Sequence, residues 1–156
     1  MKNEIQHLVT LLTSTFEKGA WHGPTVKEVL APVSETQAQF RLPDTHSIVE
    51  LVNHMTAWRK FTVKKLEGDD LFKVNEEEDN FPARTNWNQA LRDLDESQRA
   101  LIDAITVFPA NKLDDILPGS DGKFTYYALI HGIIHHDLYH VGQIRLMMIA
   151  QSSHKN

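Results

Sequence analysis

Residues 125–150 read TYYALIHGIIHHDLYHVGQIRLMMIA, a stretch without proline in which apolar residues recur at helical spacing. Residues three or four positions apart lie nearly above one another on a helix surface. One such face is formed by Leu129, Ile133, His136, His140, Gln143 and Met147. This pattern predicts a long helix that turns one side toward a core and places two histidines in the middle of that side.

Three other segments have the same helical spacing and carry end signals. They cover residues 2–18, 47–67 and 86–107. Ser47 and Glu50 are spaced as a capping box, and Gly68 follows the same segment as a helix stop. Only Gln98 interrupts the apolar stripe of the third segment. No strand pattern competes with these helices, so the sequence predicts an all-α protein built as a four-helix bundle.

The connections suggest how the bundle is joined. A long connection with short helical pieces separates the first two helices, which predicts a topology other than simple up-down-up-down. The loop of residues 69–85 contains the acidic run 76–79, and we interpret that run as a solvated surface loop. No repeat or domain boundary is visible in the 156 residues, so we expect one domain over residues 1–156.

Composition narrows the classes of function. The formal net charge is −5 and no lysine/arginine cluster stands out, so we expect no nucleic-acid partner. No apolar run approaches the roughly 18–20 residues that span a membrane, and no signal peptide opens the chain, so we expect a cytoplasmic protein. The chain has no cysteine. Disulfides, thiolate ligands and cysteine nucleophiles are therefore excluded, and any thiol chemistry needs a thiol from outside.

Histidines form the most unusual pattern, since four of the nine fall between positions 131 and 140. His136 and His140 are one helical turn apart, a spacing that lets two imidazoles converge on one ion at about 2.0–2.1 Å. His54 lies on the apolar stripe of the second long helix. A single histidine on such a face is more often a hydrogen-bonded core residue. Three buried imidazoles without partners would leave several polar atoms unsatisfied, at roughly 1–3 kcal/mol for each atom, and a shared ion removes this cost. The sequence therefore predicts a divalent metal ion held by His54, His136 and His140.

His131 and His135 form a second pair at the same spacing and are an alternative set of ligands. Their stripe is less apolar and lies beside the first, so we prefer His136 and His140. Whether His131, His135 or His22 contributes to the pocket stays open.

Three neutral histidines leave a coordination position free, which is typical of a catalytic metal site. Zinc is our first choice, and nickel, iron and manganese also accept imidazole. The run from His136 to His140 is similar to the zincin pattern with Asp137 in place of glutamate, so Asp137 is a candidate catalytic base or a residue that orients a ligand. A solvent-facing aspartate is the alternative. Gln143 could hydrogen-bond a ligand histidine, a water or the substrate.

The residues that carry these patterns resemble the DinB/YfiT-like family of metal-dependent proteins. The resemblance rests on Ser47–His54 and on the run His136-Asp137-Leu138-Tyr139-His140-Val141-Gly142-Gln143-Ile144. The segments Trp21–Pro24 and Leu66–Gly68 are also similar to a branch of that family. Together they cover most of the chain, from about residue 21 to residue 147.

The resemblance implies a four-helix bundle of unusual connectivity, often a homodimer, with a metal site that maps onto His54, His136 and His140. It also implies a thiol-dependent transferase that uses a low-molecular-weight thiol such as bacillithiol, mycothiol or glutathione on a small-molecule substrate. Two alternatives remain: a metal-dependent hydrolase that uses metal-activated water, and a metal-binding module without catalysis.

Overall fold

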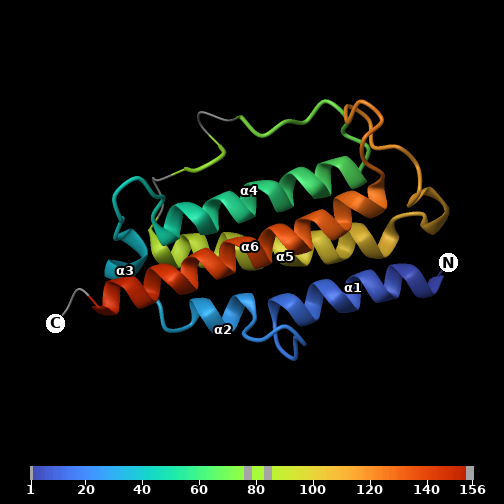
Figure 1. Cartoon of the computed structure of the whole chain (residues 1–156). Helices are drawn as coiled ribbons and strands as arrows, with labels where there is room; N and C mark the ends of the chain where they lie inside the picture. Colours follow the sequence, from blue (N-terminus) through green and yellow to red (C-terminus); the bar gives the residue numbers. More distant parts are fainter. Residues whose placement is uncertain (1, 76–78, 83–85, 154–156) are drawn as a thin grey trace.

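The computed structural model describes residues 2–75, 79–82 and 86–153, and its regular structure there is helical (Figure 1). The long helices are α1 (Lys2–Phe16), α4 (Ile48–Leu66), α5 (Trp87–Val107) and α6 (Tyr126–Ser153). The short ones are α2 (Val26–Leu30), α3 (Glu35–Gln39) and the 3₁₀-helix η1 (Ala110–Lys112). The predicted all-α fold is confirmed. Within the described ranges, no helix is both long and apolar enough to cross a membrane.

Helix α4 shows how local sequence sets the helix ends. At its start the Ser47 hydroxyl accepts from the Glu50 amide while the Glu50 carboxylate accepts from the Ser47 amide, the predicted capping box. At its end Gly68 adopts φ +88, a left-handed conformation that favours glycine. The Gly68 amide donates to the carbonyl of Lys65 and the Asp69 amide to that of Lys64, which completes a Schellman motif.

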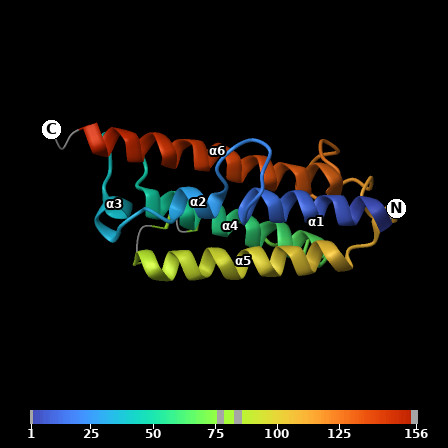
Figure 2. The same ribbon diagram turned by 90° about the horizontal axis from the view of Figure 1, so that it is seen from below.

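The four long helices form a square in which α4 contacts α5 and α6, and α1 contacts the same two helices from the opposite corner. Helices α1 and α6 run in one direction, whereas α4 and α5 run in the other (Figures 1 and 2). Because α4 and α5 are parallel neighbours, the chain between them must return along the bundle. The predicted non-simple connectivity is therefore correct. The returning connection joins α4 to α5, however, and the segment between α1 and α4 instead places α2 and α3 toward one end of the bundle.

The core consists of two apolar clusters with a polar layer between them. One cluster lies toward α2 and α3, and the other lies toward η1. In three long helices an almost fully buried polar residue lies near the boundary between the two clusters: Arg59 in α4, Gln98 in α5 and Asp137 in α6. At most 2% of each of these residues is exposed. The polar residue that interrupts the stripe of α5 thus belongs to a layer that crosses the bundle.

Arg59 is the centre of this polar layer. Its Nη2 donates to Asp137 Oδ2 at 2.6 Å, its Nε donates to the same carboxylate, and its Nη1 donates to Gln98 Oε1 at 3.0 Å. The guanidinium carbon lies 4.5 Å from the centre of the Phe16 ring in α1. One side chain therefore touches the other three long helices. The sequence pattern did not identify it, because an arginine on a helix is ordinarily at the surface.

We expect Asp137→Ala to lower the free energy of unfolding by about 3–5 kcal/mol, because it leaves the Arg59 charge buried without its partner. The triple variant Arg59→Met, Gln98→Leu, Asp137→Leu removes the charge with its partners and should lose much less. Urea unfolding of the wild type and the two variants measures both losses of free energy. A triple variant as unstable as Asp137→Ala would show that the ion pair itself stabilises the fold.

Candidate metal centre

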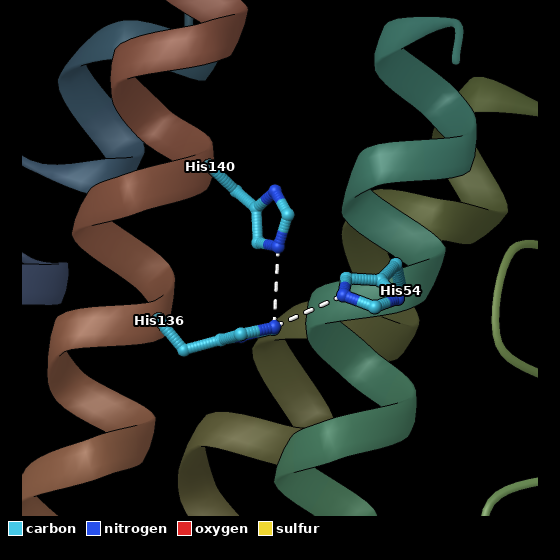
Figure 3. Close-up of side chains that lie close together, drawn as sticks. All are labelled: His54, His136 and His140. Carbon is cyan, nitrogen blue, oxygen red and sulfur yellow. Dashed lines mark hydrogen bonds between the residues drawn. The ribbon is translucent and has the colours of Figure 1, made fainter. Parts of the chain in front are cut away.

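The structure brings together the three histidines that the sequence singled out. His54 comes from α4, and His136 and His140 reach toward it from consecutive turns of α6 (Figure 3). The Nε2 atom of His136 lies 3.0 Å from that of His54 and 3.1 Å from that of His140. In a tetrahedral zinc site with bonds of 2.0–2.1 Å, ligand nitrogens are about 3.3 Å apart. The spacing of these rings is therefore close to that of a metal site.

Hydrogen bonds at the other ring nitrogen fix the tautomers of two histidines. The Nδ1 atom of His54 lies 2.7 Å from the backbone oxygen of Asn80, and the Nδ1 atom of His140 lies 2.6 Å from Oε1 of Gln143. A carbonyl oxygen only accepts, so each Nδ1 carries the proton. In a neutral ring the Nε2 atom is then a bare lone pair. Both lone pairs face Nε2 of His136. The Gln143 contact is one of the roles that the spacing suggested for this residue.

His136 cannot satisfy both neighbours by itself. Its Nε2 can carry at most one proton, while two lone pairs approach it, and its Nδ1 is buried without a hydrogen-bond partner in the described part of the chain. A cation among the three Nε2 atoms would accept all three lone pairs at once. The donor set therefore fits a divalent metal ion. No fourth histidine, aspartate or glutamate joins this group within the described residues, so a coordination position would remain for a reactant.

The segment 79–82 lies beside His54, at the end of the loop that contains the acidic run, and Asp79 of that run is exposed. Glu76–Glu78 lie outside the described residues, but the residues after them contact α4. Besides its backbone bond to His54, Asn80 accepts from Trp58 Nε1 through its side chain at 3.1 Å. The Phe81 ring stacks on His54 with the centroids 4.0 Å apart, and the Pro82 oxygen accepts from the Asn53 side chain.

We call residues 79–82 the strap. Although Asp79 is exposed, the strap holds the ring of His54 by a hydrogen bond from Nδ1 to the Asn80 oxygen and by the stacked ring of Phe81. The strap has no helical or strand periodicity, so no sequence signal that we used pointed to it. Its topological origin is clear, since it belongs to the connection that returns from the end of α4 to the start of α5.

Asp137 lies beside His136 in the sequence, but its carboxylate is in the polar layer. Only 1% of it is exposed, and both its oxygens accept from Arg59. Burial raises the pKa of the Asp137 carboxyl, and the Arg59 guanidinium acts against that rise. Through this pair Asp137 anchors the turn of α6 that presents His136 to the site.

The other candidate histidines lie outside the group that could hold a metal. The His131 ring packs against Tyr127 with the centroids 4.5 Å apart, His135 is exposed, and His22 is exposed in the loop after α1. Their ring nitrogens do not join those of His54, His136 and His140 in the group. The structure thus selects the pair that our sequence analysis preferred.

Electrostatics keep the three central rings neutral. Burial is the largest cause that lowers the pKa of His54, His136 and His140. For His136, the neighbouring imidazoles and Arg59 act in the same direction and bring the pKa to about 3. Neutral imidazole is the form that binds metal ions. The fold therefore prepares these rings as ligands near neutral pH.

The lowered pKa values predict that the metal-free protein loses stability in acid. An unfolded histidine has a pKa near 6.5, so between pH 6.5 and about 3 the unfolded chain binds protons that the folded His136 refuses. The free energy of unfolding should therefore keep its highest value above pH 6.5. Below pH 6.5 it should fall by at most about 1.4 kcal/mol per pH unit for each such ring.

Urea unfolding from pH 7 to pH 4 in the presence of a chelator measures this dependence. In the His136→Gln variant, which has no ring to protonate at that position, the decline should be shallower. An unchanged decline would mean that other groups cause it.

Comparison with known proteins identifies the family of this chain. The family model for the DinB superfamily matches residues 21–144, a range that includes all three histidines of the centre. No curated protein and no solved structure matched the chain. The family match covers most of the chain and coincides with the helical fold that the sequence patterns predicted. The chain belongs to the DinB superfamily.

Proposed function

We propose that this protein is a metal-dependent enzyme that transfers a low-molecular-weight thiol to a small electrophile. The observation that carries the proposal is the convergence of three neutral imidazoles whose Nε2 atoms leave a position for a reactant. A divalent ion held there would lower the pKa of a thiol or water bound beside the histidines. Zinc is our first choice, and nickel, iron and manganese fit the same ligands.

The absence of cysteine supports a thiol brought from outside. In the transfer, the thiol sulfur bonds to the electrophilic carbon, the thiol proton passes to solvent, and the electron pair of the broken bond departs with the leaving group. The residues of the chain prepare the site for this reaction. Asn80 and Gln143 fix the tautomers of two ligands, and Arg59 holds Asp137 and with it the turn that carries His136.

Hydrolysis by metal-activated water is the alternative within the same site. It would need a base near the reactant, and Asp137 was our sequence-based candidate. The bond from Arg59 and the burial of the carboxylate instead favour a positioning role for Asp137. A binding module without catalysis would need a closed set of ligands, whereas the group of described residues offers three. Both observations favour thiol transfer.

The direct test combines metal content with thiol conjugation. We expect the wild type to bind one equivalent of zinc or nickel and, when loaded, to conjugate at least one of bacillithiol, mycothiol and glutathione to a model electrophile. His136→Ala should lose metal affinity by more than about 100-fold, because a direct ligand matters more than outer partners whose loss costs 10–100-fold. His135→Ala, which changes an exposed histidine next to it, is the matched control. Loaded protein that conjugates none of the thiols would refute the proposal.

The strap gives a second prediction. Asn80→Ala removes the side-chain anchor to Trp58, so the carbonyl that orients His54 should be held less firmly. We expect metal affinity to fall by about 10–100-fold. Trp58→Phe removes the donor of the same bond and should have a similar effect, whereas Asp79→Ala changes an exposed neighbour and should have none. Competition with a chelator measures the affinities. Wild-type affinity in both anchor variants would show that the strap does not position His54.

A further inference from the structure

An apolar pocket of about 450 Å³ opens beside the metal centre, between α4 and α6. Two loop segments, 70–73 and 117–124, form its outer wall. Its lining is mostly aromatic and aliphatic, with Trp58, Phe61, Phe72, Leu117, Phe124, Leu129 and Ile133. His136 lines the same pocket, so the pocket reaches one of the three rings of the centre. A concave apolar site of this size suits a small organic molecule.

The pocket runs lengthwise along α4. Trp58, whose ring centroid is 6.1 Å from that of His136, marks one end. Lys65 is seven residues further along α4, a rise of about 10 Å. Helix α6 runs the opposite way, so Phe124, just before its start, lies toward the Lys65 end. The pocket therefore has a metal-centre end and a lysine end, separated by an apolar and largely aromatic wall.

The lysine end carries a net positive charge. Lys65 and Lys73 both line the pocket, and Asp70 is the one acidic residue among its described lining residues. Lys65 is 96% buried and donates from Nζ to the backbone oxygens of Asp69 and Asp70 at 3.2 and 2.6 Å. An ammonium has three donors, so one remains after these two bonds. Lys73 is exposed at the rim and free to meet a ligand.

We propose that this pocket binds an organic anion with a flat, apolar body, whose acidic group meets Lys73 and Lys65 and whose body extends along the aromatic wall to His136. One part of this inference rests on the proposed function: the organic anion is taken to be the electrophilic substrate of the thiol transfer. A single net charge at one end suits one carboxylate or sulfonate. The apolar wall disfavours a ligand that carries charge along its length, because a buried charge without a partner is costly.

Gly132 supplies the sharpest way to test the pocket. It lies in the second turn of α6, lines the pocket, and, apart from its chain neighbours and the adjacent helix backbone, has no atom within 4 Å of the position that a Cβ would occupy. A side chain at this position would enter open pocket space without a clash in the helix. Gly142 is a glycine of the same helix with equally open surroundings, and it does not line the pocket. The two positions form a matched pair.

The experiment uses two fluorescent probes on the metal-free, full-length protein. Anilinonaphthalenesulfonate carries a flat apolar body with one sulfonate, and N-phenylnaphthylamine has the same body without the charge. We expect the wild type to bind both and to prefer the sulfonate. Gly132→Phe should weaken both probes at least tenfold, whereas Gly142→Phe should leave both unchanged. Lys73→Met should weaken the sulfonate by about threefold to fivefold and leave the neutral probe unchanged, as expected for an exposed charge.

The outcomes separate this inference from the metal chemistry, because probe binding needs no metal. The proposed pocket would be refuted if protein with native circular dichroism did not bind the sulfonate probe, or if Gly132→Phe bound the probes as well as the wild type. Neither result would bear on the proposed metal site. If Lys73→Met kept the wild-type preference for the sulfonate, the proposed contact between the ligand's acidic group and Lys73 would be refuted. If Gly132→Phe does not fold, Gly132→Leu and Ala128→Phe fill the same space and replace it. Normal probe binding without thiol transfer would refute only the proposed function.

Discussion

The rest of the structure depends on the buried bond between Arg59 and Asp137. It ties α4 to α6 by directional contacts, whereas the apolar clusters on either side would tolerate small rotations and shifts. Asp137 is adjacent to His136, and Arg59 lies little more than one helical turn after His54. The bond thus fixes the rotation and the axial position of the two helices that carry the histidines. Buried polar groups that set the register of packed helices are well attested, and they can do so without adding net stability.

The candidate metal centre and the polar layer differ in how their buried polar groups are stabilised. In the polar layer a charge is buried together with its partner, so the pair can remain charged. In the centre the buried rings of His54 and His140 lie beside the half-buried ring of His136, and their lowered pKa values keep all three neutral. Arg59 connects the two, since its charge also lowers the pKa of His136. The same arginine therefore aligns the helices and helps to keep a ligand ready for a cation.

Helical periodicity predicted most of the fold and the three central histidines. The spacing of His136 and His140 within a long helix needed no tertiary information, and His54 could be found because it occupied an apolar stripe.

Arg59 was missed because arginine is ordinarily exposed on a helix, although it shares a buried stripe of α4 with Ile48, Val52, Met55 and Thr62. The heptad spacing of that stripe would have revealed it. Asn80 was missed for another reason, since it makes its contacts from irregular chain. The crossing connection was placed between the wrong helices because loop length alone does not give helix direction.

The order of the helices along the chain also governs when the site can exist. Its contacts join residues 82 positions apart, and α6, which supplies two of the three imidazoles, follows all the other helices of the described residues. During synthesis His54 emerges well before the other two, so a nascent chain on the ribosome exposes a single ring of the three. A metal ion that needs all three rings could be held only after α6 has been made and has docked. Binding of such an ion would thereby be coupled to completion of the bundle.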